Sequence, residues 1–150
     1  MRAVIQRVSE ASVKIQNEIV GQISQGFLVL LGIEELDSSE DVEWLCRKVA
    51  QMRVFEDQDG KMNDSLLDQS GEVLVVSQFT LHASTKKGNR PSFTKAARPE
   101  HAEPLYEEFL AQMEKQIDKS CARGRFGADM KVSLVNDGPV TIIIDSKNKE

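Results

Sequence analysis

Cysteine and histidine are scarce in this sequence of 150 residues, which contains two of each. Cys46 and Cys121 do not form a Cys-x-x-Cys pair, and two cysteines cannot build a disulfide framework. We expect both to be buried apolar residues of a protein in a reducing compartment. His82 and His101 stand apart from any cysteine pair and from any His-Glu-x-x-His pattern, so the sequence predicts no metal site.

Long apolar runs and nucleotide-binding motifs are also missing. The longest apolar runs, at 27–31 and 140–144, are far shorter than the roughly 20 residues that a membrane helix needs. The first residues do not resemble a signal peptide, so we expect a cytoplasmic protein without a membrane segment. No glycine-rich phosphate loop and no Gly-x-Ser-x-Gly elbow occurs. These absences argue against a nucleotide-dependent enzyme and a conventional serine hydrolase, and we expect no cofactor.

The net charge is -5, with 40% hydrophobic and 29% charged residues, which favours one globular domain over residues 1–150. We expect a frayed polar tail from about residue 146. An acidic chain does not coat nucleic acid by bulk charge, yet residues 79–99 contain no acid. Five cations stand in that stretch: Lys86, Lys87, Arg90, Lys95 and Arg98. A second basic cluster comprises Lys119, Arg123, Arg125 and Lys131. Such clusters are usually solvated surface, and phosphate binding is the alternative.

The apolar pattern predicts an α/β domain. Alternation predicts strands at 3–8, 11–15 and 19–23, and continuous apolar segments predict buried strands at 26–33 and 72–77, the latter running into 78–81. A short strand is expected at 53–55, and two more at 131–135 and 140–144. Helices are expected after the cap residues 37–39 and over the apolar face of 105–117, with Pro104 in the first turn. We expect mainly antiparallel strands in a curved or barrel-like sheet, with both helices packed outside it.

Small polar groups gather where the buried strand at 72–77 ends. Ser77, Gln78, Phe79, Thr80 and Leu81 follow the apolar run directly. The structural interpretation is a strand end whose hydroxyls complete its hydrogen bonds. The functional interpretation is that backbone N–H groups at a bend bind a developing oxyanion, while Gln78 orients a substrate hydroxyl.

A second candidate segment stands at 136–141, where Asn136, Asp137, Gly138 and Pro139 precede Val140 and Thr141. All four leading residues favour turns, so a simple connection between two strands is one interpretation. A Gly-Pro bond in a tight turn is also a place where a cis peptide is tolerated. A cis bond would direct the two carbonyls to one side, as a rigid acceptor pair suited to an amino group.

These two segments resemble the signature motifs of the bacterial-type D-aminoacyl-tRNA deacylases. Three further stretches resemble the same family: 1–8, 87–93 and 126–130. The resemblance covers residues 1–145 in order and spacing. It implies a homodimeric hydrolase with the fold of that family, which cleaves D-amino acids, and mischarged glycine, from tRNA.

The resemblance also implies roles for residues. Gly138 and Pro139 of one subunit would enter the active site of the other and reject L-amino acids. Gln78 would face the ribose 2′-hydroxyl, which assists the attacking water, and the N–H groups of Phe79 and Thr80 would bind the carbonyl oxygen. The remaining expected site residues are Ser77 and the Thr80 hydroxyl in the pocket, Arg7 as a brace for the incoming Gly-Pro loop, and Phe126 and Met130 in the pocket lining. Lys86, Lys87, Arg90, Lys95 and Arg98 would contact tRNA phosphates.

Two alternatives remain open at this point. One is a small-molecule esterase that uses Ser77 or Thr80 as its nucleophile, for which no activating base is evident. The other is a non-catalytic RNA-binding homodimer in which Gln78 and Pro139 are structural. Neither explains the five matching stretches together.

Overall fold

The computed structural model describes residues 1–150, in eight strands, two α-helices and one 3₁₀ turn. The strands are β1 (Arg2–Ile15), β2 (Glu18–Ile23), β3 (Gly26–Gly32), β4 (Arg53–Glu56), β5 (Met62–Ser65), β6 (Glu72–Ser77), β7 (Ala122–Arg123) and β8 (Lys131–Asp145). The helices are α1 (Ser39–Gln51) and α2 (Pro99–Ile117), and the turn η1 spans Phe79–His82. The expected two helices and most of the expected strands are therefore present.

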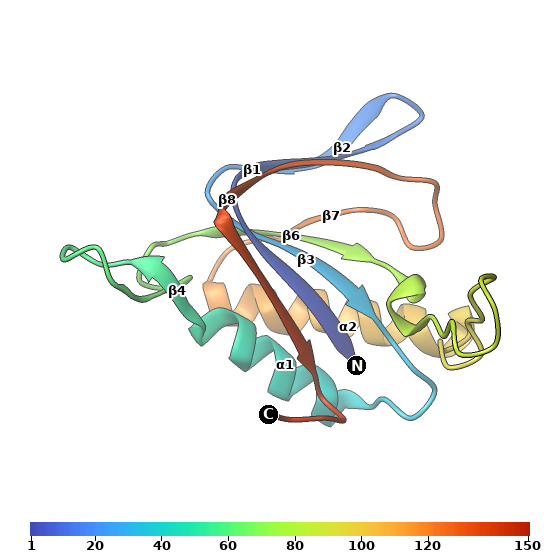
Figure 1. Cartoon of the computed structure of the whole chain (residues 1–150). Helices are drawn as coiled ribbons and strands as arrows, with labels where there is room; N and C mark the ends of the chain where they lie inside the picture. The colour runs from blue at the N-terminus through green and yellow to red at the C-terminus, as the bar shows by residue number, and fades with distance from the viewer.

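β1 is the centre of a strongly curved six-stranded sheet (Figure 1). It pairs antiparallel with β3 through residues 2–8, with β2 through residues 11–15, and with β8 along its other edge. β6 adds parallel to β3, and β7 adds parallel to β6. A Cβ at Gly21 in β2 would lie 2.7 Å from the carbonyl oxygen of Arg123 in β7, so the two ends of the sheet almost meet. The barrel-like, mainly antiparallel prediction is confirmed, with two parallel pairs added.

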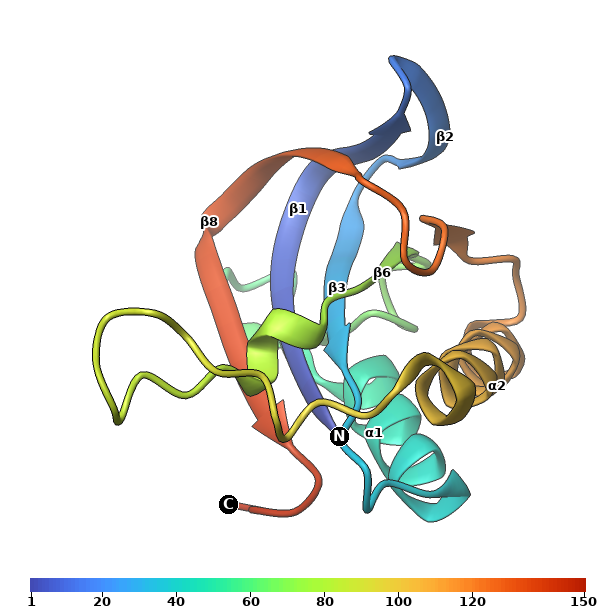
Figure 2. The same cartoon turned by 90° about the vertical axis from the view of Figure 1, so that its right-hand side faces the viewer.

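Both helices lie side by side against one face of the sheet (Figures 1 and 2). The larger core fills the space between them and includes the fully buried Phe27, Leu45 and Phe109. A smaller cluster, including Val13 and Leu74, fills the inside of the curved sheet. Neither helix combines the length and the apolar character that crossing a membrane requires.

Cys46 and Cys121 are buried and unpaired, as predicted. Burial raises the pKa of the Cys121 thiol to about 12, and it also raises the pKa of Cys46. Because the thiolate is the reactive form, both side chains behave as apolar core residues.

The expectation of two separate final strands is wrong, because residues 131–145 form the single strand β8. Both halves of β8 pair with β1, with Gln6 opposite Thr141 and Val8 opposite Asn136. β8 therefore advances five residues where β1 advances two, and the turn-forming residues bulge out of the ladder instead of reversing the chain. In the same way, the predicted strands at 3–8 and 11–15 are one continuous strand, β1.

Other boundaries also differ from the prediction. Residues 79–82 form a 3₁₀ turn and do not extend β6. The second helix begins at Pro99, so Pro104 lies inside it and not in its first turn. Pro99 takes the first helical position, where a missing N–H breaks no hydrogen bond. β5 and β7 were not expected, because one is polar and the other has only two residues.

The two ends of the chain meet at the start of α1, so the tail is not frayed where it begins. Ser146 is buried and its N–H donates to the carbonyl of Met1 at 2.8 Å. The Asp41 carboxylate accepts hydrogen bonds from the N–H of Ser38, at 2.9 Å, and from Lys147 Nζ, at 2.8 Å. Burial alone would raise the pKa of Asp41, but these hydrogen bonds outweigh burial and hold the pKa well below its usual range.

We predict that Asp41→Asn lowers the free energy of unfolding by about 1–2 kcal/mol at pH 7, because it weakens a helix cap and removes an ion pair. The carboxylate stabilises the fold fully above its unfolded-state pKa of about 4, and this contribution is lost as the pH falls toward the depressed folded-state pKa. The difference between variant and wild type should therefore shrink at low pH. Urea unfolding at pH 7 and at pH 3 measures it, with Asp59→Asn, in an exposed turn, as control. Equal effects of the two substitutions at pH 7 would contradict the prediction.

Candidate active site

A pocket of about 520 Å³ opens between η1, the start of α2 and residues 126–130. Four of the predicted site residues line it together: Ser77, Gln78, Phe79 and Thr80. Most of the remaining lining is apolar and includes Leu31, Ile33, Ala97 and Ala102. A concave, mainly apolar pocket with a few polar groups at one end is typical of a small-molecule site.

The polar end of the pocket is built by the transition from β6 to η1. The N–H of Gln78 donates to the carbonyl of Leu31 at 2.8 Å, which extends the pairing with β3 by one residue. Phe79 and Thr80 then begin η1. The first N–H groups of a helical turn have no acceptor within the turn, so two adjacent donors are left at the pocket. Such a pair can stabilise negative charge on a carbonyl oxygen.

The side chains at this turn contain no acid–base pair. Thr80 Oγ1 has one hydrogen-bond partner, Nε2 of Gln78 at 3.1 Å. The nearest histidine in sequence, His82, is buried, with Nδ1 3.8 Å from Glu34 Oε2. The other histidine, His101, is in hydrogen-bond contact with the carbonyl of Asp37. The Thr80 hydroxyl therefore lacks the base that a nucleophile needs for activation.

Phe126 and Met130, two further candidate residues, line the same pocket. The Phe126 ring lies 5.9 Å from that of Tyr106, whose hydroxyl donates to the carbonyl of Val75 in β6 at 3.0 Å. Sequence reasoning did not assign a role to Phe93, which lines the pocket and contacts Phe79 edge-to-face at 5.1 Å. Phe93 ends one of the stretches that resemble the family, and this was the available indication.

Gly138 and Pro139 do not line the pocket of their own chain. The bond between them is cis, and both residues are exposed on the bulge of β8. Arg7 is 7% exposed, and its Nε donates to the carbonyl of Asp137 at 2.9 Å while Nη1 donates to that of Val54. Arg7 thus holds the Gly-Pro loop of its own chain, in a small separate pocket. The structure therefore brings Ser77–Thr80, Phe126 and Met130 together in one pocket. Arg7, Gly138 and Pro139 lie outside that pocket.

The segment between η1 and α2 extends away from the body of the molecule (Figure 2). Its five cations are exposed and none makes an ion pair: Lys86, Lys87, Arg90, Lys95 and Arg98. We call these residues the basic loop; its last member, Arg98, reaches the pocket. In the second basic cluster, Arg123 pairs with Glu107 and Lys131 with Asp129. Arg125, the residue before Phe126 of the pocket lining, is exposed and also makes no ion pair, so the basic loop and Arg125 both offer unpaired positive charge close to the pocket.

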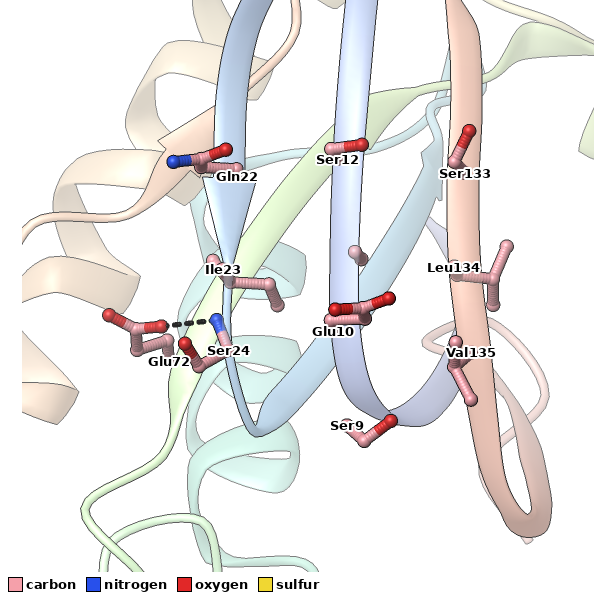
Figure 3. Close-up of a pocket in the computed structure, with 11 residues that line it drawn as sticks. Ser9, Glu10, Ser12, Gln22, Ile23, Ser24, Glu72, Ser133, Leu134 and Val135 are labelled. Atoms are coloured by element: carbon pink, nitrogen blue, oxygen red, sulfur yellow. Dashed lines mark hydrogen bonds between the residues drawn. The ribbon is translucent and has the colours of Figure 1, made fainter.

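A second hollow of about 570 Å³ crosses β2, β1 and β8 (Figure 3). Hydroxyl, amide and carboxylate groups dominate it, including Ser9, Ser12, Ser133 and Glu10. Glu72 accepts a hydrogen bond from the N–H of Ser24 at 2.6 Å. None of the predicted site residues lies there, and no group of three or more His, Cys, Asp or Glu residues is placed to hold a metal ion.

Comparisons with known proteins agree over the whole chain. Residues 4–145 match the sequence model of the family described as D-Tyr-tRNA(Tyr) deacylase. The D-aminoacyl-tRNA deacylase of Christiangramia forsetii is 60% identical over 149 residues, covering 99% of both chains. The D-aminoacyl-tRNA deacylase of Bacteroides thetaiotaomicron is 57% identical and covers 100% of both.

Two solved structures have the same fold. The c-Myc DNA unwinding element binding protein superposes with a TM-score of 0.90 and 44% identity, covering 97% of this chain and 98% of its own. A probable eukaryotic D-amino acid tRNA deacylase superposes with a TM-score of 0.82 and 16% identity, covering 95% and 97%. The chain therefore belongs to the D-Tyr-tRNA(Tyr) deacylase family.

Proposed function

We infer that this protein, a hydrolase of the D-aminoacyl-tRNA deacylase family, cleaves the ester between a D-amino acid and the terminal adenosine of tRNA. Water adds to the ester carbonyl, the bond between the acyl carbon and the ribose oxygen breaks, and the ribose oxygen takes up the proton that the water gives up, which restores its hydroxyl. The products are a free D-amino acid and tRNA. The observation that carries this function is the pocket at η1, where two N–H donors and Gln78 meet an apolar wall.

The N–H groups of Phe79 and Thr80 bind the carbonyl oxygen as it gains negative charge. Gln78 contacts the ribose 2′-hydroxyl, which assists the attack of water, and the hydroxyls of Ser77 and Thr80 complete the pocket. This assignment is supported by the absence of a base at Thr80 Oγ1, whose only hydrogen-bond partner is an amide. An activated ester needs positioning more than it needs a strong protein base.

Selectivity for D-amino acids comes from Gly138 and Pro139 of a partner subunit. Their carbonyls receive the substrate amino group, and the side chain of an L-amino acid collides with them. Glycine has no side chain to reject, so glycyl-tRNA is also hydrolysed. Two observations support a gate from a partner: the loop is exposed and rigidly held by the buried Arg7, and it lies outside the pocket of its own chain.

The proposal requires a homodimer. Three apolar side chains are left exposed at η1 and along β8: Phe79 is 58% exposed, Val135 49% and Ile143 68%. β8 pairs only with β1, so its other edge is free. Apolar side chains beside an unpaired strand edge favour association with a second copy.

The tRNA backbone binds the basic loop. Its five cations are unpaired, exposed and continuous with the pocket through Arg98. Contacts to phosphates carry no sequence information, so binding should be weak, sensitive to salt and shared by many tRNAs.

We predict that Gly138→Ala lowers the ratio of D- to L-tyrosyl-tRNA hydrolysis by at least about tenfold. A Cβ at this residue would lie 2.8 Å from Val140 Cγ2 and 3.0 Å from Arg7 Nη2, and the φ of 137° is one that alanine rarely adopts. The loop must therefore move, and the gate moves with it. Initial rates on the two enantiomers, measured side by side, give the ratio.

Gly60→Ala is the matched control for this substitution. Gly60 also has a positive φ, of 73°, but a Cβ there would meet nothing within 4 Å, in a turn far from the pocket in sequence. Wild-type protein that hydrolyses both enantiomers equally well would contradict the proposed function itself. An unchanged ratio in Gly138→Ala would contradict only the proposed role of the Gly138–Pro139 loop in selectivity.

We predict that replacing Lys86, Lys87 and Arg90 with alanine raises KM and leaves kcat nearly unchanged. The slope of log KM against log salt concentration should fall by about 2, because each lost phosphate contact contributes roughly 0.7–0.9 to it. The control replaces Lys119, Arg123 and Lys131, which removes the same charge but from groups that already have partners. A salt response identical to wild type in the first variant would rule out the basic loop as the tRNA contact.

A further inference from the structure

A side chain near the N-terminus, that of Arg2, is hydrogen-bonded to the turn η1. Leu81 follows Phe79 and Thr80, the two residues whose N–H groups face the pocket. Its carbonyl accepts a hydrogen bond from Arg2 Nη1 at 2.7 Å. Thr80 O already accepts the N–H of Ala83 at 3.1 Å. The guanidinium therefore satisfies a carbonyl at the end of the turn that would otherwise need water.

Arg2 is itself fixed by Asp145. Nε and Nη2 of Arg2 both donate to Oδ2 of this carboxylate, at 3.1 and 2.9 Å. The other oxygen, Oδ1, accepts the N–H of Lys147 at 3.0 Å. Since the guanidinium is planar, its fork on Asp145 also fixes the direction of Nη1. Burial alone would raise the pKa of Asp145, but these hydrogen bonds hold it below its usual value, so the carboxylate stays charged at neutral pH.

Backbone pairing fixes both residues of this pair, which we call the Arg2–Asp145 bracket. Arg2 and Asp145 stand opposite each other in the β1–β8 ladder, and Arg2 also stands opposite Gly32 of β3. The bracket thus connects the sheet to η1, in which His82 packs against Gly32 of β3 while Phe79 and Thr80 are exposed. A shift of Leu81 would be passed directly to the two N–H donors that precede it.

We propose that Arg2, oriented by Asp145, is a positioning residue for the reaction: it sets the direction of the Phe79 and Thr80 N–H groups through the carbonyl of Leu81. This role rests on the proposed function of η1 and adds a residue that does not line the pocket. Because the N–H donors act mainly on the charge of the transition state, loss of Arg2 affects kcat more than KM.

The test compares Arg2→Ala, Arg2→Lys and Asp145→Ala with wild type on D-tyrosyl-tRNA. We expect kcat of Arg2→Ala to fall by about tenfold or more while KM changes by less than about twofold. Arg2→Lys keeps the charge but has no planar fork, so it should lose kcat as well. Asp145→Ala should cause a smaller loss, because Nη1 can still reach Leu81. Ethylguanidinium at millimolar concentration should restore part of the kcat of Arg2→Ala, which a merely structural loss would not permit.

The control is Arg53→Ala, since Arg53 Nε also donates to a backbone carbonyl, that of Asn63 at 2.7 Å, far from η1. Thermal unfolding of both alanine variants separates lost stability from lost positioning. Wild-type kcat in Arg2→Ala, or a loss of kcat matched by Arg53→Ala, would overturn the proposal.

A second measurement separates this inference from the proposed function. In a ¹⁵N–¹H spectrum without substrate, the amide signals of Phe79 and Thr80 should shift in Arg2→Ala and move back on addition of ethylguanidinium. Unmoved signals would overturn the positioning role even if the enzyme is active. Wild-type protein without deacylase activity would overturn the proposed function, while the amide signals would still decide whether Arg2 sets the turn.

Discussion

The placement of the Gly138–Pro139 loop depends on the hydrogen bonds of one buried side chain, the guanidinium of Arg7. It stands where the β1–β8 ladder loses its register, and it bonds the carbonyls of Asp137 and Val54. A buried arginine needs such partners, because an unpaired charge in the core would be costly. By holding the bulge of β8, Arg7 presents Gly138 and Pro139 to the outside, away from the pocket at η1. If the proposed gate is correct, one chain thus contains two halves of a site that it does not bring together.

Each half of the site has its own means of rigidity. The loop at Gly138 depends on Arg7 and on the hydrogen bond from the Val140 N–H to Asn136 Oδ1 at 3.1 Å. The turn η1 depends on pairing of Gln78 with Leu31 and on the Arg2–Asp145 bracket. Neither half contains an acid–base pair, so in the proposed mechanism each contributes geometry: fixed donors and fixed acceptors around an ester that is already reactive. In this account the tRNA supplies the hydroxyl that a protein base supplies in other hydrolases.

The sequence predicted the parts of this molecule that are governed by local pattern. The apolar stripe from Val42 to Met52 and the buried strands at 26–33 and 72–77 were confirmed, and the candidate residues at η1 line one pocket. It failed where long-range pairing decides: turn formers at 136–139 became a bulge because β1 offers partners on both sides of them. The contact of Arg2 with Leu81 joins residues 79 positions apart, and no sequence spacing could indicate it.

In the proposed dimer, a complete site combines η1 of one chain with the Gly138–Pro139 loop of another. The most direct test mixes two defective proteins, Gln78→Ala and Gly138→Ala, by co-expression with different tags and isolation of the mixed dimer. In a shared site, one of the two sites of that dimer has both halves intact, so about half of the wild-type activity on D-tyrosyl-tRNA should return with full rejection of the L-form. Activity on D-tyrosyl-tRNA no higher than that of Gln78→Ala, a D-to-L ratio no higher than that of Gly138→Ala, or a protein that remains monomeric would contradict the account.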